Sequence, residues 1–286
     1  MRNRMPQGFT LVEMSIVLVV IGLIAAGVLV GRDLIRHAEL VKLHGQYTEI
    51  VTAIQTFKTK YNCLPGDCPN ATDFFGSLGN LCPNMNNPSY THTSPAVFSS
   101  ATPGSATCNG DGDGRIDAGS TLYEMLTLWQ QLATTGLIGG SYTGGAFHGS
   151  LVAPGYNCPL MAASSSRCWV VFDGDNSSWL ASFPSPPPVT IVPVHLGTVL
   201  TPSGQLLGGS LQLTGTFTPA EAMSYDAKYD DGSPVSGNIL IAFGSQHCTN
   251  GNAMISSPAN ATAQYLANDP VFSNLPTCNL VHRAGF

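Results

Sequence analysis

An apolar run near the N-terminus constrains this chain more than any other feature. The run extends from Phe9 to Val30 and carries one charged residue, Glu13. Basic residues flank it on both sides: Arg2, Arg4 and Arg32. At about 1.5 Å per residue, a helix over this run would cross a hydrocarbon core of ~30 Å. Since no second run of this length occurs, the sequence predicts one membrane crossing, with the basic leader in the cytoplasm and everything after Arg32 on the far side.

A cleavable secretory signal peptide is the alternative interpretation of this run. Ala25-Ala26-Gly27 is a passable cleavage site of the small-residue type. The run is, however, longer than the ~7–15 apolar residues of a signal peptide, and it contains Glu13. An ionisable residue within a membrane segment is costly and usually has a function. The sequence therefore favours an apolar helix that the mature protein keeps.

The start of the run has a distinctive hexapeptide. Gly8-Phe9-Thr10-Leu11-Val12-Glu13 follows a short basic leader and precedes the apolar helix. These residues resemble the prepilin motif of the type IV pilin family. The resemblance implies cleavage between Gly8 and Phe9 by a membrane aspartic peptidase, followed by N-methylation of the new Phe9 amine. It also implies that the helix is retained, first as a membrane anchor and then as the core of a filament.

Glu13 fits that role on physical grounds. A buried carboxylate needs a partner, and the apolar run offers no Lys, Arg or His. The Phe9 amine, a cation once it is freed by cleavage, could pair with Glu13 of a neighbouring subunit and fix the axial register. The alternative is that Glu13 only reaches up to the headgroup region.

The helix is expected to continue well past the membrane segment. Apolar residues at spacings of three and four form one stripe: Tyr47, Ile50, Val51, Ile54, Phe57 and Tyr61. Pro65 and Gly66 follow the stripe and end the helix. The chain thus divides into a leader of residues 1–8, a helix over residues 9–62 (~80 Å long) with its anchor and filament core at 9–30, and a globular extracellular head over 63–286.

The predicted fold class is α+β: a long N-terminal helix packed against a disulfide-rich head with an antiparallel β-sheet. Capping boxes at Thr121–Glu124 and Thr218–Glu221 predict two helices in the head. Gly136 is expected to close the first of them. Four segments have the composition of strands: Cys168–Phe172, Thr190–Leu200, Leu206–Thr214 and Asn238–Phe243.

Two stretches of the head are similar to stretches of large pilin-like proteins of bacteria. They are Tyr61–Asp67, continued by Pro69–Thr72, and Tyr225–Pro234. The similarity implies that the whole chain is one pilin-like protein and that the head is not an enzyme grafted onto a pilin tail.

All eight cysteines lie in the head. An even number confined to the translocated part indicates disulfides formed in an oxidising envelope or exterior. The spacing alone leaves many pairings open. The order along the chain suggests bridges between neighbours: Cys63–Cys68, Cys82–Cys108, Cys158–Cys168 and Cys248–Cys278.

The segment Asn109–Asp117 matches a calcium-binding loop through its ninth position. The pattern has oxygen ligands at positions one, three, five and nine and Gly at position six. The expected ligands are Asn109, Asp111, Asp113, the Arg115 carbonyl and Asp117. Ser120 stands at position twelve, where the pattern has a bidentate Glu, and Glu124 on the following helix is expected to replace it. The alternative is an Asp/Gly-rich turn without an ion.

Other chemistries find no support in the sequence. With charged residues at 10%, a net charge of −6 and no basic cluster, the chain lacks the cations that nucleic-acid binding needs. No haem-attachment, nucleotide-binding or hydrolase motif occurs. We therefore expect that the protein binds neither haem nor nucleotide and that it is not an enzyme. A second acidic group, Asp226, Asp230 and Asp231, is expected to serve as turn and cap residues.

Two classes of function remain. The first is a structural subunit that polymerises into a type IV pilus-like extracellular filament. The alternative is a minor pilin or type II secretion pseudopilin, which primes a fibre, drives secretion or DNA uptake, or presents an adhesive head. In both classes the expected partners are copies of itself, other pilins, the prepilin peptidase and the inner-membrane assembly machinery. The precursor would lie in the bacterial inner membrane, with its head outside the cytoplasm, before it joins a surface filament.

Overall fold

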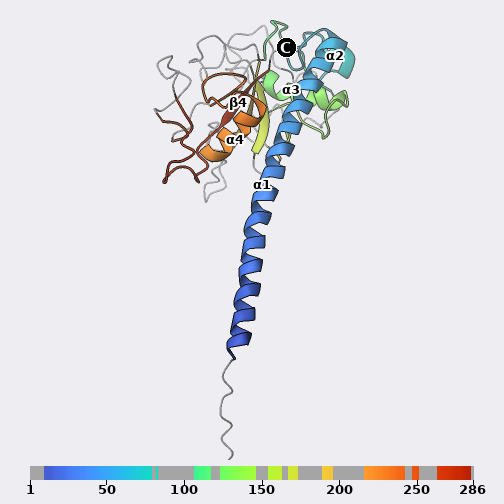
Figure 1. Ribbon diagram of the computed structural model, residues 1–286. Coiled ribbons are helices and arrows are strands. Elements are labelled where there is room, and N and C mark those ends of the chain that lie inside the picture. The colour runs from blue at the N-terminus through green and yellow to red at the C-terminus, as the bar shows by residue number, and fades with distance from the viewer. Residues whose placement is uncertain are drawn as a thin grey trace, which may run out of the picture. The chain divides into compact units, whose positions relative to one another are not determined.

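The computed structural model describes residues 10–78, 82, 106–116, 123–145, 154–162, 167–172, 189–195, 216–241, 247–250 and 263–284. The chain forms two compact units, Met1–Gly45 and Gln46–Phe286. Helix α1, Leu11–Tyr61, contributes to both units (Figure 1).

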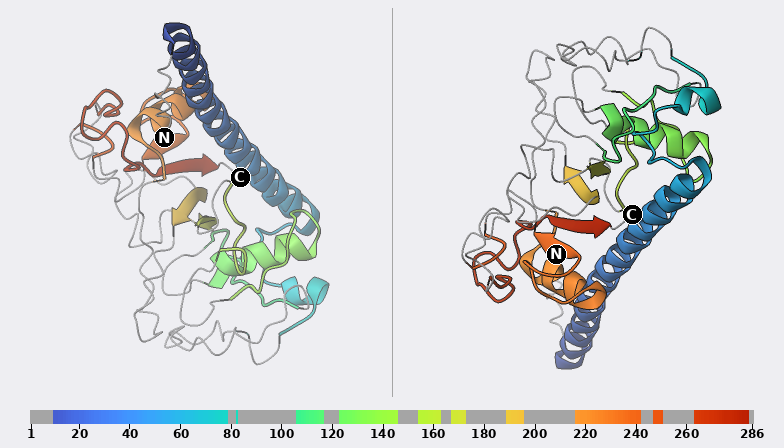
Figure 2. Two further views of the ribbon diagram at one scale, coloured as in Figure 1. Left: turned by 90° about the horizontal axis from the view of Figure 1, so that it is seen from below. Right: turned by 90° about the horizontal axis from the view of Figure 1, so that it is seen from above.

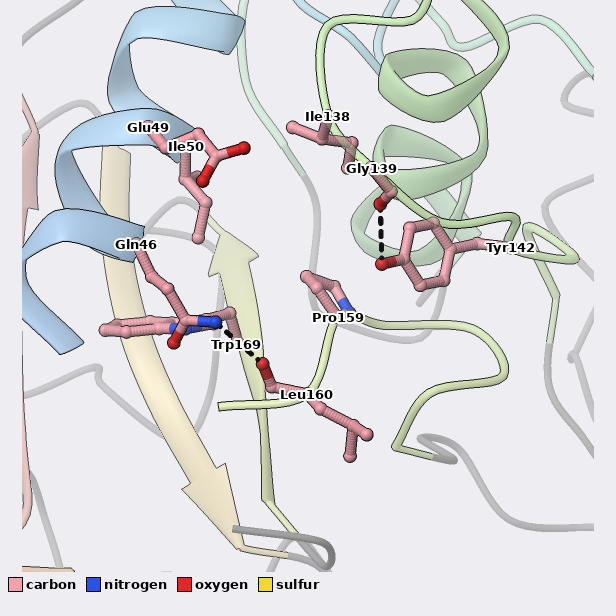
Figure 3. A pocket seen from close by; sticks show the side chains of 9 residues that line it. All are labelled: Gln46, Glu49, Ile50, Ile138, Gly139, Tyr142, Pro159, Leu160 and Trp169. Atoms are coloured by element: carbon pink, nitrogen blue, oxygen red, sulfur yellow. Dashed lines mark hydrogen bonds between the residues drawn. The ribbon is translucent and has the colours of Figure 1, made fainter. Parts of the chain in front are cut away.

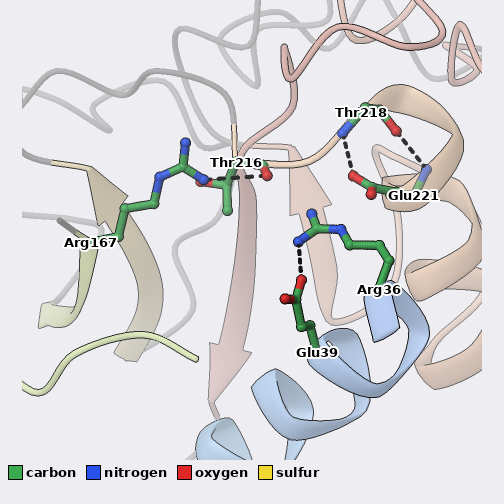
Figure 4. A network of polar contacts seen from close by, with 6 residues as sticks. All are labelled: Arg36, Glu39, Arg167, Thr216, Thr218 and Glu221. Atoms are coloured by element: carbon green, nitrogen blue, oxygen red, sulfur yellow. Dashed lines mark hydrogen bonds and ion pairs between the residues drawn. The ribbon is translucent and has the colours of Figure 1, made fainter. Parts of the chain in front are cut away.

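The first unit consists of the apolar part of α1. This part is long and apolar enough to cross a membrane, and its large side chains, from Leu11 to Ile35, are exposed. Directly after this stretch, Arg36 Nη1 and Glu39 Oε2 form an ion pair of 2.9 Å (Figure 4). The predicted membrane segment is thus helical from Leu11 onward, while Phe9 lies outside the described residues.

The second unit begins with the amphipathic part of α1. Ile50, Ala53, Ile54 and Phe57 are buried, which confirms the core of the predicted stripe. The helix ends at Tyr61, and Asn62 adopts a left-handed conformation with φ of 58°. The prediction that the helix runs to Asn62 is therefore right to within one residue, and the chain already turns before it reaches Pro65 and Gly66.

In the described part of the chain three shorter helices follow: α2, Ala71–Phe75; α3, Tyr123–Thr134; and α4, Pro219–Tyr229. The predicted capping box of α4 is confirmed, because Thr218 Oγ1 accepts a hydrogen bond from Glu221 N (3.2 Å) and Glu221 Oε2 accepts one from Thr218 N (2.9 Å; Figure 4). The helix predicted after Thr121 is present as α3, although Thr121 itself lies outside the described residues. Gly136 follows α3 in a left-handed conformation.

The sheet has four antiparallel strands in the order β1-β2-β4-β3. The strands are β1, Arg167–Phe172; β2, Val189–His195; β3, Ile239–Ile241; and β4, Leu280–Ala284. In both views of Figure 2, α2 and α3 lie on one side of β2 and β4, and α4 lies on the other. Trp169, the largest buried side chain of β1, therefore belongs to a core that several elements share.

Three of the four predicted strands overlap strands of the sheet. Parts of these predictions lie outside the described residues: residues 196–200 of the second strand, the whole of the third, Leu206–Thr214, and residues 242–243 of the fourth. Strand β4 was not predicted, although it pairs with both β2 and β3. Its sequence, LVHRA, contains a His and an Arg within five residues, and tertiary pairing overrides such a weak local preference.

Four disulfides tie the head together. The bridges are Cys63–Cys68, Cys82–Cys108, Cys158–Cys168 and Cys248–Cys278, with Cα–Cα distances of 5.1, 5.4, 5.8 and 5.0 Å. Each bridge joins neighbours in the order of cysteines along the chain, which is the pairing that this order suggested. Native bridges in small domains typically add about 2–4 kcal/mol each to the free energy of unfolding. The four bridges therefore stabilise the folded head.

Replacing buried side chains of α1 should destabilise the second unit. Ile54→Ala and Phe57→Ala should each lower the free energy of unfolding by about 2–5 kcal/mol, because both side chains are fully buried. Thr56→Ala, at an exposed position of the same helix, should stay within about 0.5 kcal/mol. Urea unfolding of the detergent-solubilised chain measures the difference. Equal effects at all three positions would contradict the burial of this stripe.

Candidate functional site

Helix α1 begins with a capping box formed by Thr10 and Glu13. Glu13 Oε2 accepts hydrogen bonds from Thr10 N and from Thr10 Oγ1, both at 2.8 Å. In return, Glu13 N donates to Thr10 Oγ1 at 3.3 Å. The capping role of Glu13 was not predicted from the sequence, although Thr-x-x-Glu before an apolar run is the pattern of a capping box. The carboxylate is thereby held beside the amide that follows Phe9, while Gly8 and Phe9 themselves lie outside the described residues.

The predicted calcium loop folds around a residue from another part of the chain, Asp67. The Asp67 carboxylate accepts hydrogen bonds from the backbone N–H groups of Gly112 (2.6 Å), Asp113 (3.1 Å) and Gly114 (3.0 Å). Oxygens of Asp67, Asp111 and Asp113 all lie within 4.8 Å of one another. The structure thus brings together two predicted ligands and a third carboxylate that the sequence did not indicate.

Glycine allows the two segments to approach this closely. A Cβ atom on Gly110 would lie 2.3 Å from the backbone of Asp67, and Gly110 N donates to Cys68 O at 2.9 Å. Gly66 has φ of 92°, in the left-handed region that favours glycine. No periodicity or local spacing links residue 67 to residue 111, so only the folded chain reveals Asp67.

The other predicted ligands take different positions. Asn109 Oδ1 accepts a hydrogen bond from Thr72 N (2.8 Å), at the start of α2. Glu124 is buried in α3, and its Oε1 accepts a bond from Asp111 N at 3.2 Å. Arg115 N donates to Asp113 Oδ1 at 2.8 Å. Asp117 lies outside the described residues.

The electrostatics of this cluster centre on Asp67, whose side chain is buried. Burial raises the pKa of the Asp67 carboxyl to about 7, while the N–H groups of Gly112 and Gly114 act in the opposite direction. Asp113 and Asp111 add a smaller upward shift by charge repulsion. A divalent cation would offset both the burial and the repulsion, and carboxylate oxygens are the ligands that calcium prefers. The same bonds also order the loop as a turn without an ion, so calcium binding stays a prediction.

If the loop binds calcium, thermal unfolding of the full chain should shift upward with calcium relative to chelator. Because Ser120 replaces the bidentate Glu, the dissociation constant should lie in the range of about 10⁻⁴–10⁻³ M that is typical of extracellular modules. Asp111→Asn and Asp113→Asn should remove the shift, whereas Asp73→Asn, at an exposed position of α2, should keep it. Identical melting with calcium and with chelator would show that the loop is only a turn.

The second acidic group holds a turn and the edge of the sheet. Asp226 is buried and accepts hydrogen bonds from Tyr265 OH (2.7 Å) and Gly232 N (3.1 Å). Asp230 Oδ2 accepts a bond from Ile239 N at 2.7 Å, where β3 begins. Asp231 accepts bonds from Ser233 N and Ser236 Oγ. These bonds fit the prediction of turn and cap residues.

The buried Asp226 should make stability depend on pH. Burial raises the pKa of Asp226 to about 6 against the bonds from Tyr265 and Gly232. The native state therefore binds this proton more tightly than the unfolded chain does, so the contribution of Asp226 to stability should fall as pH rises from about 4 to 6 and then level off. Asp226→Asn should flatten this part of the profile, by up to about 3 kcal/mol.

Urea midpoints at intervals between pH 4 and 7 measure the effect. Asp73→Asn, the exposed control, should run parallel to the wild type. A profile of Asp226→Asn that also runs parallel to the wild type would contradict the burial cost of Asp226.

Comparison with known families identifies the N-terminal site. Residues 3–29 match the family model of the prokaryotic N-terminal methylation motif. This motif is the prepilin signal of type IV pilins and pseudopilins, so this segment of the chain is similar to their N-termini. Gly8, Phe9 and Glu13 all fall within the matched residues. Comparisons with curated proteins and with solved structures give no match.

Proposed function

We propose that the protein is a structural subunit that polymerises through its N-terminal helix into a type IV pilus-like extracellular filament. The observation that carries the proposal is the apolar surface of α1 behind the methylation motif. Between Leu11 and Ile35 the large apolar side chains are exposed, with fractions as high as 86% at Leu11. A continuous apolar surface of this size needs a cover, first lipid and then the equivalent helices of neighbouring subunits.

Maturation would convert the precursor into a subunit that can assemble. Cleavage after Gly8 by the prepilin peptidase removes the basic leader and creates the Phe9 amine. Glu13, already held by Thr10, is exposed in the single chain. Assembly would bury its carboxylate against the Phe9 amine of a neighbouring subunit. Inner-membrane assembly machinery and other pilins are the remaining partners. The head plays a structural part in this scheme, not an enzymatic one.

The decisive experiment for this function is analysis of material sheared from the surface of cells that express the chain. Electron microscopy should show thin filaments, and mass spectrometry should identify this protein as their dominant component. Cells without the gene should lose these filaments. Filaments that persist in cells without the gene would contradict the proposal.

Two variants, one at Glu13 and one at Thr10, separate capping from charge pairing. Glu13→Gln keeps an oxygen that can accept the Thr10 bonds but removes the charge, so filament yield should fall sharply. Thr10→Ser keeps the capping hydroxyl and the charge, and it should assemble normally. Both variants should still insert in the membrane, since Glu13→Gln removes a charge, which favours the bilayer, and Thr10→Ser leaves the charge unchanged. Wild-type yield from Glu13→Gln would show that Glu13 serves only as a cap.

A minor pilin or type II secretion pseudopilin is the second candidate, and a hollow in the head favours its adhesive version. The hollow measures about 550 Å³. It is lined by Met223, Gly232, Ser233, Pro234, Ala263, Gln264, Tyr265, Ala267 and Asn268. These residues carry hydroxyl and amide groups but no formal charge, which suits an uncharged, hydroxylated ligand. Two results would support this candidate over the first. The protein would be present at low copy number in sheared filaments, and cells without the gene would still form filaments but would no longer attach.

A further inference from the structure

A second, smaller hollow opens beside the amphipathic part of α1 (Figure 3). Its volume is about 210 Å³, below the ~300–1,000 Å³ of pockets that take whole small molecules. The lining comes from α1, from the segment after α3 and from the chain around β1: Gln46, Glu49, Ile50, Ile138, Gly139, Tyr142, Pro159, Leu160 and Trp169. A space of this size suits the end of one side chain.

The walls of this hollow are held by internal hydrogen bonds. Gln46 Oε1 accepts bonds from Ala162 N (2.7 Å) and Trp169 Nε1 (3.2 Å), and Gln46 Nε2 donates to Leu160 O at 3.1 Å. Tyr142 OH donates to Gly139 O at 3.1 Å. Since Trp169 and Tyr142 are also buried, the hollow is formed in advance of any ligand, which lowers the entropic cost of binding.

The chemistry of the lining combines apolar walls with a single charge. Ile50 and Ile138 are buried, and Leu160 is partly open to solvent. Glu49 is the one lining residue with a formal charge, and in Figure 3 it extends into the space that faces Tyr142. Burial and, to a smaller degree, the Glu49 charge raise the pKa of Tyr142. Within the described part of the chain, Glu49 forms no ion pair.

We propose that this hollow receives the end of a lysine or arginine side chain from a second copy of the chain. Such a side chain has an apolar stem, which matches Ile50, Ile138 and Leu160, and a cationic head, which matches Glu49. The chain has 11 basic residues against 17 acidic ones, so its exposed cations are few. Four of them lie on α1, the helix through which the proposed filament assembles and to which we assign the docking side chain: Arg32, Lys42, Lys58 and Lys60. The proposal rests on the proposed function, because filament assembly is what presents one copy to another.

Charge exchange in assembling cells tests the pairing. Glu49→Lys should lower the filament yield by roughly tenfold or more, since like charges would meet in the hollow. Combining it with Arg32→Glu, Lys42→Glu, Lys58→Glu or Lys60→Glu should restore the yield in one of the four pairs. Asp73→Lys, at an exposed position elsewhere on the head, should leave the yield unchanged. An unchanged melting temperature of each variant shows that the head still folds.

A small-molecule probe tests the same chemistry without assembly. Nα-acetyl-lysine methylamide should shift the Trp169 indole N–H resonance of the full chain in detergent, and Nα-acetyl-norleucine methylamide, which lacks the ammonium group, should not. Glu49→Gln should weaken the response by roughly fivefold.

The outcomes separate this proposal from the proposed function. If the wild type forms no filaments, the proposed function fails, and the probe still decides whether the hollow binds a cation. Wild-type filaments from Glu49→Lys, or no restoration in any of the four pairs, would overturn docking of α1 from a second copy. A probe response without restoration would assign the hollow to a free amine, and that also overturns the proposal.

Discussion

Burial of one face of α1 is the interaction on which the head depends. Ile50, Ile54 and Phe57 are almost completely buried, and burying side chains of this size contributes about 1.5–3 kcal/mol each. Gln46, at the start of this stretch, adds three hydrogen bonds to the chain around β1. The residues that follow α1 therefore pack against this face of the helix. The same contacts form the hollow beside Glu49.

The apolar residues of α1 nearer the N-terminus do not have one buried face and one polar face. They have no polar face, and an all-round apolar helix needs either lipid or other helices as its surroundings. The methylation motif at residues 3–29 agrees with this requirement, because pilin-type processing retains the helix and removes only the leader. The capping box of Thr10 and Glu13 begins the helix with its carboxylate already oriented.

Features encoded by adjacent residues could be predicted from the sequence. The extent of α1, the capping box at Thr218 and the pairing of neighbouring cysteines all belong to this kind. Features set by distant residues could not. Strand β4 gains its place by pairing with β2 and β3, and Asp67 reaches the Asp111 loop only because Gly110 lets two backbones touch. The loop pattern identified Asp111 and Asp113, but Asn109, its first position, bonds to α2 instead.

The central claim is that the apolar helix survives maturation as part of the working protein. Mass spectrometry of the N-terminal peptide of the protein isolated from its native membrane or filament tests this most directly. The account predicts that the protein begins at N-methylated Phe9 and retains the whole of α1. A mature protein that begins at or after Ala26 would contradict it, because that product is what a secretory signal peptidase would leave.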